Sequence, residues 1–205
     1  MDFGLGEDVF HYAQEKGIKI LLSDAISNAR GAVFKKNGRW YIQIDPHDTI
    51  ERQCFTIAHE LAEIELDDVQ DFSIDEKHHM ANYRAGEILL PDKIFKPLVF
   101  KHTLYDLKNL FPTCSYEVLA RRIAAFRQVI VTIYDNKSLT LRIGSEGIRY
   151  PIRPDTVELD IINECYEKRE LIQKTCTNLE LEAYYIAVNP DFQRVILLAF
   201  IQDEF

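Results

Sequence analysis

The alternation of apolar and polar residues predicts a small sheet in the first part of the chain. Residues 8–16 fit a short helix, IKILL at 18–22 indicates a buried strand, and GAVFKKNGRWYIQID at 31–45 fits a β-hairpin. Asn37 and Gly38 supply the positive φ angles that a tight hairpin turn requires. We therefore expect a sheet that leads directly into the helices that follow.

Two longer helices are predicted after this hairpin. The stretch 48–66 lacks Pro and Gly, and Asp48 or Thr49 can cap its first turn. At ~100° per residue, apolar residues occupy most of its sides, so we expect this helix to be buried on both sides. The stretch 75–89, DEKHHMANYRAGEIL, predicts a second helix that stops at Pro91.

The second half of the chain predicts a helical hairpin and then an α/β region. Residues 103–126 have a helix, turn and helix rhythm. Strands VIVTIYD and LTLRI, joined by an Asn-Lys turn, precede a helix at about 155–173 and a last hairpin, LEAYYIAV and RVILLAFI, that turns at 189–191. These patterns predict an α+β fold in three parts, with boundaries at 1–102, 103–128 and 129–205.

Composition excludes several classes of protein. A chain of 205 residues with 47% hydrophobic and 11% aromatic content can bury a substantial core. No apolar run approaches the ~18 residues of a membrane span, and MDFGLGEDVF lacks the pattern of a signal peptide. We expect a globular cytoplasmic protein without a membrane partner. The four cysteines lie far apart and form no CxxC pair, so we expect free thiols.

The charge gives little reason to expect DNA binding. The formal net charge is −9. Between residues 101 and 130 it is +3, from five Lys or Arg against two acids. The basic residues in that region are Lys101, Lys108, Arg121, Arg122 and Arg127. A local excess of this size predicts no strong affinity for duplex DNA.

The helix at 48–66 carries unusual chemistry for a buried element. His59, Glu60 and Glu63 lie within CFTIAHELAEIEL, among apolar residues. A charged group without a partner is costly to bury and shifts its pKa until it is neutral. These side chains therefore need partners inside the protein, and a metal ion is one such partner.

The second helix offers a further ligand. His78 shares one stripe with Ala81, Asn82 and Ala85, and the two alanines would let another helix approach closely. If the face holding His59 and Glu63 packs there, three ligands converge. His79 is the rival to His78, because a helix that started one residue later would rotate the pair.

The two strings FTIAHELAEIEL and MANYRAGEILLP together resemble the ImmA/IrrE family of zinc metallopeptidases. The helices of that family are similar to FTLAHELGH and E-x-x-A-N-x-F-A-A-x-L-L-M-P. The resemblance implies a zincin-like peptidase core at 1–102, a helix-turn-helix-like subdomain at 103–128 and a sensor-like α/β domain at 129–205. It also implies zinc-dependent hydrolysis of a peptide bond.

The family pattern can be carried over residue by residue. His59 matches the first zinc ligand, Glu60 the general base, Glu63 the second ligand, and His78 the downstream ligand. The family has histidine where this chain has Glu63, and glutamate where it has His78. Arg84 stands where the family has an aromatic residue, and Gly86 stands where it has alanine. The shape of the family's substrate cleft therefore cannot be carried over to this chain. The two departures among the ligands are reciprocal.

This reciprocity predicts a retained metal site. Zinc accepts imidazole nitrogen and carboxylate oxygen at similar lengths, ~2.0 to 2.2 Å, so exchanging the two ligands preserves the number and charge of the donors. Two histidines and one carboxylate also suit Fe²⁺ or Mn²⁺. Asn82 is a candidate to orient these ligands by a hydrogen bond. Tyr83 and Arg84 are candidates to stabilise the oxyanion that forms during hydrolysis.

Three functions are compatible with these patterns. The first is a zinc endopeptidase whose substrate, by resemblance, is a regulatory protein such as a helix-turn-helix repressor. The second is a non-catalytic regulatory module that keeps the peptidase fold. The third, which the charge disfavours, is a DNA-binding transcription regulator that uses residues 103–127.

Overall fold

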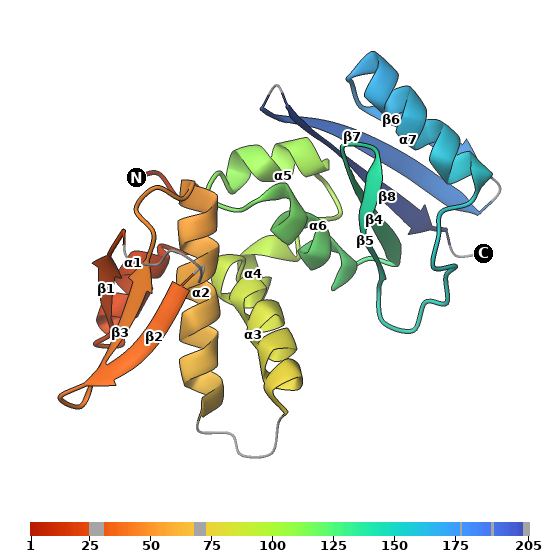
Figure 1. The fold of residues 1–205 in the computed structure, drawn as a ribbon. Coiled ribbons are helices and arrows are strands. Elements are labelled where there is room, and N and C mark those ends of the chain that lie inside the picture. Colours follow the sequence, from red (N-terminus) through yellow and green to blue (C-terminus); the bar gives the residue numbers. More distant parts are fainter. Residues whose placement is uncertain (25–30, 68–72, 177, 190, 203–205) are drawn as a thin grey trace. The chain divides into compact units, whose positions relative to one another are not determined.

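The computed structural model describes residues 1–24, 31–67, 73–176, 178–189 and 191–202. The chain forms two compact units, Met1–Val118 and Leu119–Phe205, each with its own sheet (Figure 1). Helices and strands occur in both, which confirms the predicted α+β fold class. The finer division into three parts, at residues 102 and 128, stays a prediction.

The sheet of the first unit is three-stranded, with the order β1-β3-β2. Its strands are β1 (Lys19–Leu22), β2 (Gly31–Lys36) and β3 (Arg39–Ile44). Strand β1 runs parallel to β3, whereas β2 runs antiparallel to it. Asn37 and Gly38 turn the predicted hairpin with φ angles of 51° and 78°. Strand β2 therefore lies at an edge of the sheet.

The helices of the first unit follow the predicted pattern closely. They are α1 (Val9–Glu15), α2 (Ile50–Asp67), α3 (Ile74–Leu89), α4 (Asp92–Phe95) and α5 (Leu104–Leu110), and α6 (Tyr116–Ala124) crosses into the second unit. At the start of α2, Arg52 N–H donates to Thr49 Oγ1 at 3.4 Å. A capping box between Ser73 and Glu76 begins α3. None of the helices within the described ranges combines the length and apolar character that a membrane crossing requires.

Small residues bring α2 and α3 close together. The two helices run side by side and pack along much of their lengths (Figure 1). Ala58 and Ala62 on α2, like Ala81 and Ala85 on α3, are 0% exposed. Alanine side chains permit a short distance between helix axes. The contact that was expected from the alanines of the second helix is therefore present.

The second unit is a five-stranded antiparallel sheet with one helix on it. Its elements are β4 (Val129–Asp135), β5 (Ser138–Gly144), α7 (Thr156–Lys168), β6 (Ile172–Cys176), β7 (Leu179–Asn189) and β8 (Phe192–Ile201). The strand order is β5-β4-β8-β7-β6. Helix α7 lies along one face (Figure 1), where Ile161 and Cys165 join a core with Leu181, Val195 and Leu197.

One predicted boundary in this unit is wrong. The helix expected to reach residue 173 ends at Lys168, because Arg169 adopts the left-handed conformation with φ of 56°. The residues that follow form β6, which pairs with β7. In the first unit, the short helix α4 was not predicted. Residue 190, in the expected last turn, lies outside the described residues.

A buried ion pair fastens α7 to the sheet. Arg142 on β5 and Glu158 in the first turn of α7 approach to 2.9 Å, with side chains only 4% and 5% exposed. The Arg142 guanidinium also donates to Thr132 Oγ1 and to the carbonyl oxygen of Pro151. Glu158 in turn accepts from the backbone N–H of Asp155, the N-cap of α7.

We expect Glu158→Ala to reduce the free energy of unfolding of this unit by about 3–5 kcal/mol, because it leaves Arg142 buried without its carboxylate. Urea unfolding followed by circular dichroism measures this loss. The control is Lys168→Ala, which removes the exposed Lys168–Glu164 pair on the same helix and should change little. Equal losses in the two variants would contradict the structural role of the buried pair.

Candidate metal centre

Helix α2 presents three polar side chains from an otherwise apolar environment. His59 and Glu60 are each 8% exposed, and the neighbouring Ile57, Ala58 and Leu61 are buried in the core. Glu63, one turn after His59, is half-buried. As predicted, the helix is buried on both sides in its middle part, so its polar groups point into the protein.

Two helices bring His59, Glu63 and His78 together. Glu63 Oε1 lies 3.1 Å from Nε2 of His59 and 3.6 Å from Nδ1 of His78. One donor atom from each of the three residues lies within 4.8 Å of the other two. The imidazole rings of the two histidines are 4.7 Å apart at an angle of 67°. The three predicted ligands therefore converge at the junction of α2 and α3.

This geometry fits a metal ion. Bonds of ~2.0 to 2.2 Å in a tetrahedron place neighbouring donor atoms about 3.3 to 3.6 Å apart. The distances from Glu63 Oε1 to the two imidazole nitrogens, 3.1 and 3.6 Å, are close to these donor-to-donor distances. The set of two imidazoles and one carboxylate is also one that zinc accepts in catalytic sites. His59, Glu63 and His78 could thus hold one ion with small movements.

Burial changes the acid–base properties of the site. Burial lowers the pKa of His59, against the opposing effect of the Glu63 carboxylate, so the neutral imidazole that binds metals is favoured. Burial raises the pKa of Glu60 to about 7, and the negative charge of Glu63 acts in the same direction. Two acids three residues apart on one buried helix would gain from a nearby cation.

Strand β2 approaches Glu60 through a glycine. A Cβ atom on Gly31 would lie 2.9 Å from Glu60 Oε1 and 2.4 Å from Thr56 Cγ2. The backbone of β2 therefore forms one wall of the site. Sequence reasoning did not single out Gly31, although a glycine inside a strand can indicate a close approach of the backbone to another group.

Three other candidates lie on α3. His79 is exposed and lies outside the group of three donors. Asn82 is half-buried one turn after His78, and its side chain interacts with the ring of His59. Among the described residues Nδ1 of His59 has no hydrogen-bond partner, and the role of Asn82 in orienting the ring stays a prediction. Tyr83 is 59% exposed.

Arg84 turns toward other acids. Its guanidinium lies 3.1 Å from Glu65 and 3.0 Å from Glu87. Glu65 also accepts from Lys16 at 2.7 Å, which links α1, α2 and α3. Burial would raise the pKa of Glu65, but the hydrogen bonds from Lys16 and Arg84 outweigh it and lower that pKa. The oxyanion role expected for Tyr83 and Arg84 stays a prediction.

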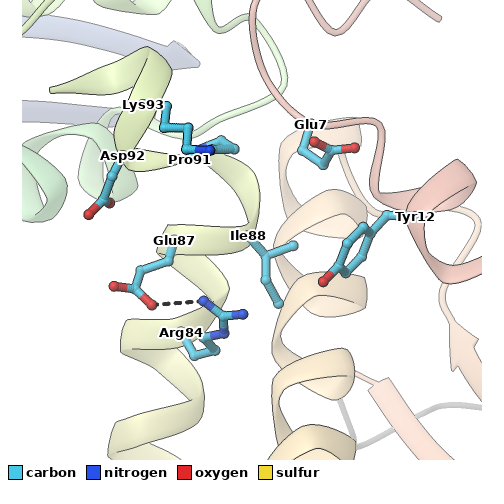
Figure 2. Close-up of a pocket in the computed structure, with 8 residues that line it drawn as sticks. All are labelled: Glu7, Tyr12, Arg84, Glu87, Ile88, Pro91, Asp92 and Lys93. Atoms are coloured by element: carbon cyan, nitrogen blue, oxygen red, sulfur yellow. Dashed lines mark hydrogen bonds and ion pairs between the residues drawn. The ribbon is translucent and has the colours of Figure 1, made fainter. Parts of the chain in front are cut away.

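A pocket of about 360 Å³ lies beside Arg84 and Glu87. Figure 2 shows Tyr12 on one side of it and the paired Arg84 and Glu87 on the other. The remaining lining residues are Glu7, Ile88, Pro91, Asp92 and Lys93. None of the three converging donors lines this pocket, so it is distinct from the candidate metal centre.

Comparisons with known proteins concern the family and the fold of this chain. Residues 13–125, more than half of the chain, match the family model described as Peptidase M78, IrrE N-terminal-like domain. No curated protein matches the sequence. A solved Mycobacterium tuberculosis transcriptional regulator is similar in structure, with a TM-score of 0.71 and 14% sequence identity over 94% of this chain and 68% of that chain. At that identity the likeness concerns the fold alone.

We expect about one zinc ion per chain, which is lost when His59, Glu63 or His78 is changed to alanine. The physical reason is that each change removes one of three donors, whereas His79→Ala removes none and serves as the matched control. Elemental analysis after dialysis measures zinc, iron and manganese together. Added zinc should also raise the melting temperature of the unchanged chain, because the ion links α2 to α3. Loss of metal in His79→Ala with retention in His78→Ala would exchange the roles of the two histidines.

The double exchange Glu63→His with His78→Glu tests the reciprocal arrangement directly. It restores two imidazoles and one carboxylate, whereas Glu63→His alone leaves three imidazoles and His78→Glu alone leaves two carboxylates. We expect the double variant to bind zinc more tightly than either single variant, with a coupling of about 1–3 kcal/mol. Competition with a chromophoric chelator gives the three affinities. If the losses of zinc affinity in the two single variants simply add up in the double variant, the predicted exchange of the two ligands is contradicted.

Proposed function

Because the chain belongs to the Peptidase M78 family through its IrrE N-terminal-like domain, we propose that it is a zinc-dependent endopeptidase. One observation carries this proposal: donor atoms of His59, Glu63 and His78 converge, and the buried Glu60 stands next to the first of them. Catalytic zinc sites commonly use three such protein ligands and keep a fourth position open. The side chain of His78 is 60% exposed, so the group of donors is open to solvent on that side.

In this proposal, three residues would bind the zinc ion and a fourth would transfer the proton. When bound, zinc lowers the pKa of water and polarises a carbonyl group. His59, Glu63 and His78 would hold the ion. Glu60 lies ~100° around the helix from His59, so its carboxylate can stand beside the ion without being a ligand. It would accept a proton from the attacking water and donate it to the leaving amine.

The substrate we propose is a regulatory protein, such as a helix-turn-helix repressor. The family resemblance supports this class, and the similar solved structure is itself described as a transcriptional regulator. An extended segment of the substrate could add to β2, which pairs with β3 alone within the described residues. Backbone hydrogen bonds to an edge strand suit substrates of varied sequence.

The basic residues after α4 give less support to a DNA-binding function. Lys108 Nζ contacts Glu51 and donates to the carbonyl oxygens of Pro112 and Cys114. Arg122 is 3% exposed. The guanidinium of Arg127 lies 3.6 Å from the centre of the Phe200 ring. Arg122 is thus buried, and Lys108 and Arg127 are half-buried with partners inside the protein. Of the five basic side chains of this region only Lys101 and Arg121 are exposed, so less positive charge is available for phosphates than the sequence suggests.

We expect Glu60→Gln to keep stoichiometric zinc and to lower the rate of peptide hydrolysis by at least about 100-fold, because the amide cannot accept the proton. Cleavage of a pool of quenched fluorescent peptides, and of purified helix-turn-helix repressors from the same organism, measures the rate. Glu87→Gln makes the same change on α3 beside the pocket and should leave both zinc and rate unaltered.

The same experiment separates the peptidase from a non-catalytic regulatory module. Stoichiometric zinc with no cleavage of any peptide or repressor by the unchanged chain would favour the module. Residual hydrolysis of equal rate in the unchanged chain and in Glu60→Gln would exclude Glu60 as the base.

A further inference from the structure

The first residue of β2 lies unusually close to α2. Gly31 pairs with Ile44 of β3 and sits against the side chains of Thr56 and Glu60. Its backbone is extended, unlike that of Gly4, Gly17, Gly38 and Gly147, which have positive φ angles. The conformation of Gly31 is therefore open to any residue, and what distinguishes the position is the lack of space for a Cβ atom.

The two contacts that a Cβ atom would make differ in kind. Thr56 Cγ2, at 2.4 Å, belongs to a β-branched side chain on a helix, whose χ1 is restricted. Glu60 Oε1, at 2.9 Å, is the end of a longer side chain that can rotate away. A clash with Thr56 would therefore strain the fold, whereas a clash with Glu60 would displace the carboxylate at little cost to the fold.

We propose that Gly31 is a positioning residue for Glu60, because its missing side chain leaves the space in which the Glu60 carboxylate is held between α2 and β2. This inference rests on the proposed function, in which Glu60 is the base. Strand β2 cannot easily withdraw, since its register with β3 continues from Gly31 to Lys36. Glu60 is 8% exposed, so the wall of β2 also limits access of water on that side.

The difference between the two contacts allows the role in positioning to be separated from a role in stability. In the full chain, Gly31→Ala should lower the melting temperature, and Thr56→Ser, which removes Cγ2, should restore most of that loss in the double variant. The contact with Glu60 remains in the double variant. Its displacement should lower kcat by about 100-fold, because misplacement of a reacting group by ~1 Å has an effect of this size. KM and zinc stoichiometry should stay as in the unchanged chain.

A measurement without zinc or substrate reports on Glu60 directly. In the metal-free chain, the ¹³C resonance of the Glu60 carboxylate carbon, assigned by its absence in Glu60→Gln, should shift in Gly31→Ala/Thr56→Ser. It should stay in place in the matched control, Thr56→Ser alone. An unshifted resonance, or a kcat restored together with the melting temperature, would overturn the role of Gly31 in positioning.

These outcomes also distinguish the inference from the proposed function. If the unchanged chain hydrolyses no peptide, the proposed function fails whatever Gly31 does. If Glu60→Gln hydrolyses peptides as fast as the unchanged chain, Glu60 is not the base, and this result too is independent of Gly31. If Glu60→Gln is inactive but the double variant Gly31→Ala/Thr56→Ser is fully active, only the inference about Gly31 fails. In the Glu60→Gln background, Gly31→Ala/Thr56→Ser should cause no further loss of rate, because the group that it displaces is already gone.

Discussion

The close contact between α2 and α3 is the constraint on which the candidate metal centre depends. The distance between packed helices is set by the side chains between them, and here four alanines are completely buried. Glu63 and His78 lie 3.6 Å apart across the two helices, so a larger side chain between the helices would move these donors apart. The bonds from Arg84 and Lys16 to Glu65 tie the same two helices to α1. The converging donors are thus a result of packing as much as of residue type.

The distribution of charge within the site follows from burial. His59 lies deepest, Glu63 is intermediate and His78 is the most exposed, with 11%, 29% and 60% of their side chains accessible. A carboxylate on the inner helix therefore stands beside a second acid, Glu60, whose pKa it helps to raise. A cation held by the three donors would offset the repulsion between the two acids. The predicted exchange of ligands between the helices would leave the donor set intact and would move the negative charge nearer to Glu60.

Much of the fold and of the candidate site could be predicted from the sequence because the relevant signals are local. Periodicity located α2 and α3, the phase of the second helix selected His78 over His79 as the residue facing Glu63, and Asn37 with Gly38 marked the hairpin. Contacts between distant residues were missed. The approach of Gly31 to Glu60 depends on how a strand packs against a helix, and the end of α7 depends on an arginine, not a glycine, in the left-handed conformation. A glycine within a predicted strand is a local signal of the first contact, whereas the end of α7 has no signal in the local pattern.

The exposure of His78 has a consequence for how quickly an ion could enter and leave. Two of the donors stand one turn apart on the same buried helix, whereas the third stands on a separate helix and is largely accessible. A metal ion would therefore meet His78 first from solution, and its release would begin with the loss of that bond. Helices open locally far more often than whole domains unfold. Exchange of the ion would then be governed by small movements of the first turns of α3, and tight binding could coexist with rapid replacement of one metal by another.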